Sequence, residues 1–191
     1  MLMPRLEPVR VTEPAELPVT VAELKLPLGL DHTADFDVYL GQLIGTAVEH
    51  LDGWRGILGR AILLQRWSQS YSRWERIMRL PMPADRLVSA SYRNSDDVEQ
   101  AFDHSQLLLH SASGASWVEA GAEVSLPATF DREDAVTLTF EAGAANAGAV
   151  PDRIKVSIIR MAMELYHDAG SSGDEALKRG TGIVSNLRNR R

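Results

Sequence analysis

The stretch VPDRIKVSIIRMAMELYH, residues 150–167, decides the fold that this sequence predicts. Pro151 suits the first turn of a helix, where its missing N–H has no partner, and Asp152 places negative charge at the positive end of the helix dipole. Most other positions are apolar, and the polar ones form one narrow stripe at helical spacing: Arg153, Ser157, Arg160, Glu164 and His167. A helix that is apolar over more than half its circumference needs cover on several sides, which its own domain and a further subunit can supply.

The composition is that of a folded protein of one or two domains. The chain has 191 residues, of which 45% are hydrophobic and 24% are charged. It contains no cysteine, which excludes disulfides and thiolate metal sites and fits a reducing cytoplasm. No apolar run approaches the roughly 20 residues that span a bilayer, and the N-terminus lacks a signal-peptide core. We therefore expect no membrane association and no export by the usual route.

The net charge of -6 weighs against a protein whose task is to grip nucleic acid. Binding to phosphates requires a concentrated basic face, and the clear basic cluster of this sequence lies at the extreme C-terminus.

Two further helices are predicted before residue 60. Thr20 and Glu23 have the spacing of a capping box and open a short helix near 20–26, which Pro27 and Gly29 end. A longer helix near 34–52 follows. Its expected buried face repeats at helical spacing and is the first candidate cover for the helix at 151–168: Phe36, Leu40, Leu43, Ile44, Ala47 and Leu51.

Thr33 is the expected N-cap of this longer helix. Gly41 and Gly45 lie one turn apart on another of its faces. Either close helix packing or simple tolerance of glycine explains them.

The stretch 61–149 changes in character and is predicted to be rich in β-strands. Val136, Leu138 and Phe140 alternate with polar residues, as a half-buried strand requires. Residues 111–116 are expected to form a loop. The other short runs are separated by proline, glycine, serine or aspartate, and the full set of expected strands is 62–71, 76–80, 86–93, 106–110, 122–126 and 135–140. Trp67, Trp74 and Trp117 are interpreted as packing residues, because basic residues do not interleave with all three.

The two ends of the chain have compositions of their own. Residues 1–18 contain four prolines and are interpreted either as an extended arm that lies across a neighbour or as a frayed terminus. Residues 169–191 are expected to form a flexible C-terminal tail, because glycine and serine are frequent in its first five residues. Its last part is either a solvated basic tail or a docking peptide, with these candidate contact residues: Ile183, Val184, Leu187, Arg188, Arg190 and Arg191.

The search for catalytic motifs predicts no catalytic, cofactor or metal site. The sequence has no phosphate-binding glycine loop, no nucleophile elbow and no HExxH helix. Its five histidines are scattered, and the acidic runs near Asp97 and Asp134 are interpreted as solvated turns. An enzyme whose site is assembled from distant carboxylates and histidines stays an alternative.

Several short motifs, taken in order, resemble one family. They are Leu17-Pro-Val-Thr20 with Val21-Ala-Glu-Leu-Lys25, Gly59-Arg-Ala61, Gln65 and Trp67, Arg79-Leu-Pro81 with Met82-Pro83, Leu87-Val-Ser-Ala-Ser-Tyr92, Leu138-Thr-Phe-Glu-Ala-Gly143 and Val150-Pro151. Their succession over roughly residues 17–168 resembles the head-to-tail connector (adaptor) proteins of long-tailed double-stranded DNA phages and of related gene transfer agents. The chain departs from this pattern at Leu26-Pro-Leu-Gly-Leu30, which favours an early end to the first helix, and after Gly143.

The resemblance implies a structural role in a virion that is assembled in the host cytoplasm. Such proteins form a ring, commonly twelve-fold, beneath the portal and join it to the stopper or tail terminator, while DNA passes through as cargo. It also implies that the C-terminal tail binds the portal. The acidic balance of the chain suggests in addition a lumen that does not retain passing DNA. Another non-catalytic virion component, such as a stopper or tail-completion protein, is the alternative.

The sequence therefore predicts an α+β fold without a cofactor. A small helical bundle, residues 19–60 and 150–168, forms the connector core, and a β-rich insertion, residues 61–149, lies between its second and last helices. An extended arm, 1–18, and the flexible tail, 169–191, complete the chain.

Overall fold

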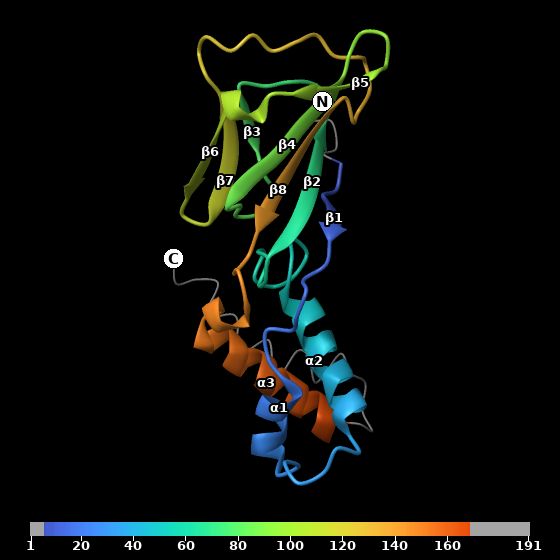
Figure 1. Cartoon of the computed structure of the whole chain (residues 1–191), viewed down its shortest axis with the longest axis vertical. Coiled ribbons are helices and arrows are strands. Elements are labelled where there is room, and N and C mark those ends of the chain that lie inside the picture. Colours follow the sequence, from blue (N-terminus) through green and yellow to red (C-terminus); the bar gives the residue numbers. More distant parts are fainter. Residues whose placement is uncertain (1–5, 169–191) are drawn as a thin grey trace. The chain divides into compact units, whose positions relative to one another are not determined.

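The computed structural model describes residues 6–168, and the chain divides into two compact units (Figure 1). Of the described residues, the β unit comprises 6–13 and 64–143, and the helical unit comprises 14–63 and 144–168. The chain therefore crosses between the units after Glu13, after Leu63 and after Gly143, and each unit is assembled from segments distant in sequence. Among the described residues, no helix is both long enough and apolar enough to cross a membrane.

The first helix of the helical unit, α1 (Val21–Leu28), begins as predicted and ends later than predicted. The capping box is confirmed, since the Glu23 N–H donates to Thr20 Oγ1 (3.2 Å) and the Thr20 N–H donates to Glu23 Oε2 (2.7 Å). These bonds to Thr20 lower the pKa of Glu23. The helix does not stop before Pro27. Its end is set by Gly29 in the left-handed conformation (φ 68°), where the N–H groups of Gly29 and Leu30 bond to the carbonyls of Leu26 and Lys25.

The second helix, α2 (Asp37–Leu51), starts later than predicted. Thr33 does not cap it, because its hydroxyl oxygen accepts the nearby Asp35 N–H (3.2 Å) and closes a local turn. Phe36 is the N-cap residue and is 42% exposed, so its place in the core was wrongly predicted. The other five residues of the predicted face are confirmed as buried: Leu40, Leu43, Ile44, Ala47 and Leu51.

The two glycines of α2 do not mark a close helix contact. A Cβ atom at Gly41 would lie 3.8 Å from Val21 Cγ2, an ordinary van der Waals distance, and one at Gly45 would meet no atom within 4 Å. Of the two interpretations, the structure therefore favours simple tolerance of glycine.

The third helix, α3 (Asp152–His167), packs into the core of the helical unit. Its buried positions repeat at i, i+3, i+4, i+7 and i+8: Ile154, Ser157, Ile158, Met161 and Ala162. This register corrects the predicted polar stripe. Ser157 is only 3% exposed and donates its hydroxyl to the Arg153 carbonyl (2.8 Å), whereas the apolar Val156 is 46% exposed.

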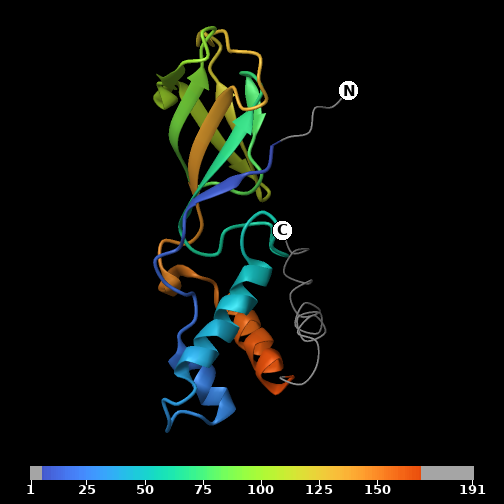
Figure 2. The ribbon, with the colours of Figure 1, turned by 90° about the vertical axis from the view of Figure 1, so that its right-hand side faces the viewer.

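The β unit contains two antiparallel sheets (Figures 1 and 2). The five-stranded sheet has the order β1 (Val9–Thr12), β2 (Gln65–Tyr71), β8 (Val136–Ala142), β4 (Arg86–Arg93) and β5 (Glu99–Phe102). The three-stranded sheet has the order β3 (Ile77–Arg79), β7 (Ala115–Ala120) and β6 (Leu107–Ala112). Short 3-10 turns lie at His104–Gln106 in this unit and at Ala147–Ala149 in the helical unit.

The α+β class and the three helices are confirmed, and the picture of a bundle carrying a β insertion is confirmed only in part. The strands form two substantial sheets, and β1 comes from the stretch expected to be an arm. Residues 111–116 are not a loop, because Ser113 (φ 50°) and Gly114 (φ 74°) make the tight turn of the β6–β7 hairpin. Residues 122–126 form no strand, and β5 was not predicted.

The inside of the β unit follows the period-two alternation of its strands. Val136, Leu138 and Phe140 are fully buried, as predicted. Trp67 and Trp74 are buried as well, and the Trp74 ring lies 4.7 Å from that of Phe102. These tryptophans are therefore packing residues.

The buried face of α3 provides the first test. Replacing Ile158, which is fully buried, with alanine should lower the free energy of unfolding by about 3 kcal/mol, because a cavity is left in the core. The matched control Val156→Ala shortens a side chain on the exposed side of the same helix. This variant should change the free energy of unfolding by less than about 0.5 kcal/mol. Urea denaturation followed by helical circular dichroism measures both. Equal losses would show that the register of α3 is wrong.

Candidate interaction surfaces

The outer face of the five-stranded sheet carries two rows of hydroxyl groups. One row joins Ser68, Thr139 and Ser89 across three strands, and the next joins Ser70, Thr137 and Ser91. The side chains of Ser70 and Thr137 hydrogen-bond to each other (3.1 Å). Because alternate residues of β2 and β8 point inward and are buried, these six residues form a neutral, hydrogen-bonding surface, which we call the hydroxyl face.

A charged row borders the hydroxyl face at one end. Glu141 accepts hydrogen bonds from Arg66 Nε (2.9 Å) and from Arg86 Nε and Nη2 (3.1 and 2.8 Å). These bonds, with Arg86 the larger influence, lower the pKa of Glu141. The Glu141 side chain is 12% exposed, whereas those of Arg66 and Arg86 are 47% and 65% exposed. The row therefore carries one uncompensated positive charge, with donors that can still reach an acidic partner.

A second ionic cluster lies beyond the other end of the hydroxyl face. Arg132 donates through Nε and Nη2 to both carboxylate oxygens of Asp134 and through Nη1 to Asp97 Oδ1 (3.0 Å). The bonds to Asp134 and Asp97 raise the pKa of Arg132, and Arg132 lowers the pKa of Asp134. The two acidic runs predicted as separate solvated turns are therefore joined through one guanidinium.

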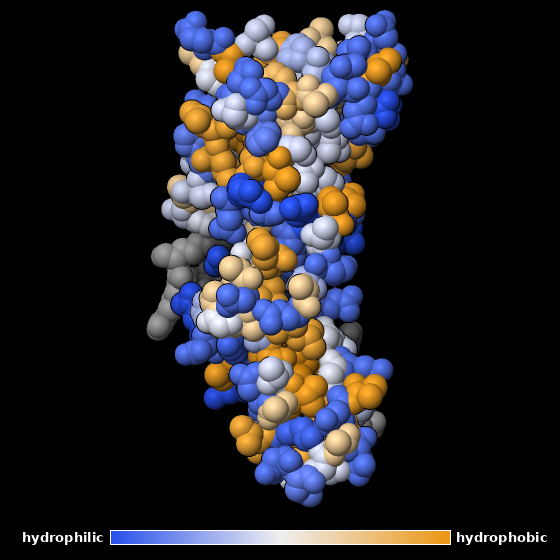
Figure 3. Space-filling view, viewed as in Figure 1, coloured by the Kyte–Doolittle hydropathy of each residue, from blue (hydrophilic) through white to orange (hydrophobic). Residues whose placement is uncertain are grey.

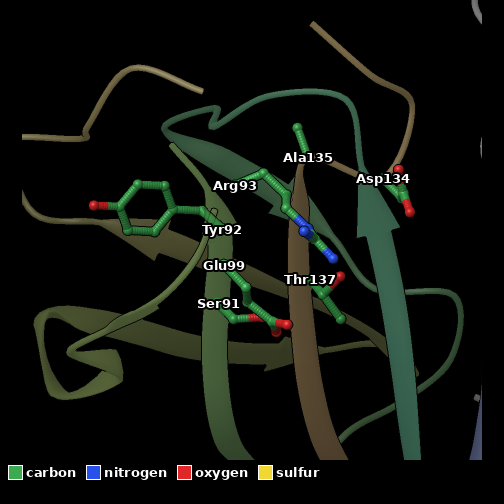
Figure 4. Close-up of a pocket in the computed structure, with 7 residues that line it drawn as sticks. All are labelled: Ser91, Tyr92, Arg93, Glu99, Asp134, Ala135 and Thr137. Carbon is green, nitrogen blue, oxygen red and sulfur yellow. The ribbon is translucent and has the colours of Figure 1, made fainter. Parts of the chain in front are cut away.

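A shallow hollow of about 300 Å³, part of it open solvent, lies beside this cluster (Figure 4). Its lining is Ser91, Tyr92, Arg93, Glu99, Asp134, Ala135 and Thr137. The Arg93 side chain already donates from Nη1 to the Asp97 carbonyl (3.0 Å). The lining brings no histidine beside a hydroxyl, so it builds no activated nucleophile. Within residues 6–168, no group of three histidines or carboxylates is placed to hold a metal ion.

The outer face of the three-stranded sheet combines apolar and charged groups. Ile77 and Leu108 flank Glu119 in one cross-strand row and are 53% and 56% exposed. In the next row the His110 ring stacks on Trp117 (centroids 5.4 Å apart), and His110 Nε2 lies 3.0 Å from Glu119 Oε2. Trp117 thus packs on the outside of its sheet. Ile77 and Leu108 come from the first of these rows and Trp117 from the second, and we call the three residues together the apolar row.

Apolar surface is distributed in separate patches. On the face drawn in Figure 3, orange apolar side chains form several groups between blue polar ones. On α3, the apolar Val156 is exposed, as are the polar residues Arg153, Arg160, Glu164 and His167. Exposed surface of this mixed kind is compatible with a contact between protein subunits.

The predicted docking residues of the C-terminal tail lie outside the described residues. They are Ile183, Val184, Leu187, Arg188, Arg190 and Arg191. The hydroxyl face and the Arg132 cluster were not predicted. The alternation of serine and threonine in residues 68–70, 89–91 and 137–139 was the signal that could have indicated the hydroxyl face.

Comparison with solved structures finds the same fold in chains of gene transfer agent (GTA) particles. A chain from the neck of an empty GTA particle, computed with C6 symmetry, has a TM-score of 0.71 and 20% identity, and the match covers 92% of this chain and 95% of that chain. A chain from the virion of a native GTA particle has a TM-score of 0.69 and 19% identity over 91% of this chain and 94% of that chain. A chain from the neck of a native GTA particle, computed with C12 symmetry, has a TM-score of 0.60 and 16% identity over 92% and 94%.

The sequence matches no protein-family model, and no curated protein matches it. At these identities the likeness to the GTA chains establishes the fold.

The charged row gives a prediction with a defined pH dependence. The variant Glu141→Gln should lose about 1 kcal/mol of stability at neutral pH, because three charge-assisted hydrogen bonds from two partly exposed arginines are weakened. Since the pKa of Glu141 is lowered by folding from its ordinary value of 4.5, the wild-type advantage is present above that pH and is lost as the pH falls through the folded-state value. Urea denaturation of both proteins over a pH series measures this difference.

The control is Glu99→Gln, which alters an exposed carboxylate on the edge strand β5. Its effect on stability should be small at every pH. A wild-type advantage over Glu141→Gln that persists in acid would contradict the role given to the two arginines.

Proposed function

We propose that this chain is a structural virion protein of the particle neck, a head-to-tail connector (adaptor) that joins the portal to the stopper or tail. One observation carries the proposal. The fold likeness extends over 92% of this chain and 95% of a chain from the neck of a GTA particle, so it includes the helical unit, the β unit and the three crossings between them. A shared single domain would not require this arrangement.

A ring of identical copies is the proposed assembly. The necks that contain the similar chains were computed with C6 and C12 symmetry, which supports a cyclic arrangement of copies. In a cyclic ring each copy contacts its two neighbours through two different surfaces. The apolar row and the exposed side of α3 are surfaces of the mixed composition that such contacts use.

The proposed partners are the portal on one side and the stopper or tail terminator on the other. Residues 169–191 form the portal-binding tail, in which Ile183, Val184 and Leu187 supply apolar contacts and the nearby arginines supply charge. DNA passes through the ring as cargo, and the protein needs neither a cofactor nor a membrane for this role. The particle, either a phage or a gene transfer agent, is assembled in the host cytoplasm.

The role proposed is structural, and two features of the described surface support it. The hollow beside Arg93 is shallow, and three of its lining residues, Arg93, Asp134 and Thr137, already take part in side-chain hydrogen bonds. The two ionic clusters of the β unit carry opposite residual charges, one positive around Glu141 and one negative around Arg132, so together they are neutral, which suits a wall past which DNA moves without being held.

Electron microscopy tests the proposed assembly. Purified chain mixed with the portal of the same particle should give rings stacked on the portal, visible in negative stain and as a co-sedimenting complex. Mixing with tail-tube protein in place of portal is the control and should leave the two proteins separate. Binding to the tail tube without binding to portal would favour the alternative, a stopper or tail-completion protein.

Deletion of residues 182–191 tests the tail. The truncated chain should lose co-sedimentation with portal, because the apolar and basic contact residues are removed, and should melt at the wild-type temperature. The triple variant Ile183→Ser, Val184→Ser and Leu187→Ser separates apolar from charged contributions, and substitution of the three arginines by glutamine is its matched control. Unchanged co-sedimentation of the truncated chain would contradict the portal-binding tail.

A further inference from the structure

Strand β1 lies at the edge of the five-stranded sheet, where it pairs with β2 alone and buries none of its four side chains. All four of its residues are exposed, with Val9 at 61% and Val11 at 54%. The register slips between Arg10 and Thr12, so Val11 sits in an irregularity of the pairing. Among residues 6–168, no strand pairs with the other edge of β1 (Figure 2).

The contacts that hold the segment 6–12 lead to strand β2. The Arg10 guanidinium lies over the Trp67 ring (5.7 Å to its centroid). Gln69 Nε2 donates to the Leu6 carbonyl (2.8 Å), and the Arg66 N–H donates to Thr12 Oγ1 (3.0 Å). Because one strand supplies all of these partners, the β2 of any copy of the chain offers the same set.

The connection of β1 to its own β2 is indirect. Fifty residues of the helical unit, 14–63, separate Glu13 from Leu64, so no short hairpin ties the two strands together. The segment Pro14–Pro18 connects β1 to the helical unit, and the next residue, Val19, is fully buried. The residues between the two prolines are exposed, and a stretch of five residues spans at most about 17 Å when extended. Two prolines keep this segment extended, and Glu16 Oε1 accepts the Ala147 N–H (2.8 Å) within the helical unit.

We propose that in the assembled ring β1 is exchanged between copies, so that residues 6–13 of one copy pair with β2 of the next. This inference rests on the proposed ring. Exchange reproduces every contact between β1 and β2, so it costs no interaction energy, and it places the edge strand of one copy on the sheet of the next. It also links neighbours through main-chain hydrogen bonds, whose formation depends little on side-chain identity.

The absence of cysteine from the sequence allows a direct test. Val9 and Ser68 are directly paired across β1 and β2. Opposed residues of antiparallel strands have Cα atoms about 4.5–5.5 Å apart, a distance that a disulfide spans. The double variant Val9→Cys with Ser68→Cys is assembled with portal, oxidised and run on a denaturing gel without reductant.

Exchange predicts a ladder of covalent oligomers, because each copy is linked to the next, and the ladder should collapse to monomer when reductant is added. Without exchange the same disulfide closes within one chain, and only monomer is seen. The matched control is Ser89→Cys with Thr139→Cys, a paired position between β4 and β8 inside the β unit, which should give monomer only.

The assembly state is recorded by negative stain on the same samples, so that failure of the ring and failure of exchange are distinguished. Rings with monomer only on the gel overturn exchange and leave the proposed function standing. A sample that shows neither rings nor a ladder overturns the proposed ring and the proposed exchange together. A ladder without rings supports exchange but overturns the ring. A second pair, Thr12→Cys with Arg66→Cys, keeps the test decisive if the first variant fails to fold, since it reports on the same pairing.

Discussion

The packing of α3 against the helices at the start of the chain is the contact on which the helical unit depends. Ile158 and Met161 are fully buried in a cluster whose other members include Leu24, Leu40 and Ile44. The chain must complete most of the β unit before α3 can reach this core. The returning strand is fixed where it re-enters, because the Ala144 N–H bonds to the Ile62 carbonyl (3.0 Å) beside a parallel bridge between Leu63 and Ala144. Residues 62–63 and Ala144, which flank two of the crossings, are therefore bonded to each other within the helical unit.

Periodicity predicted the long elements, whereas their ends depended on single residues. The buried face of α2 and the alternation of β8 follow from spacing alone, because many positions contribute to each pattern. Thr33 and Pro27 misled the prediction of helix ends, because local hydrogen bonds of Asp35 and Gly29 decided them. The β6–β7 hairpin was missed because its turn, Ser113-Gly114, lies among small polar residues that resemble a loop. Strand β1 was missed because a strand paired on one side leaves little pattern in its sequence.

The polar surfaces could not be predicted because they depend on register. Arg66, Glu141 and Arg86 are far apart in sequence and meet only because β8 pairs with both β2 and β4. Arg132 joins Asp97 to Asp134 through a fold that brings two turns together. Composition did anticipate that arginines would meet carboxylates in this acidic chain, although it could not indicate the ratios, which are two arginines to one carboxylate at Glu141 and one arginine to two carboxylates at Arg132. The residues assigned to portal binding were chosen by resemblance and composition, and their role stays a prediction.

A weakly held edge strand and a closed ring reinforce each other. One copy releases β1 at little cost, because the strand buries little side-chain surface and pairs on one side only. In an open chain of copies, one β2 at one end would lack a strand and one β1 at the other end would lack a partner. When the ring closes, this last β1 pairs with this last β2. The two strands already belong to one assembly, so their effective concentration is high. Strand exchange of this kind would therefore favour complete rings over partial ones, which is the property that a connector between two symmetric assemblies requires.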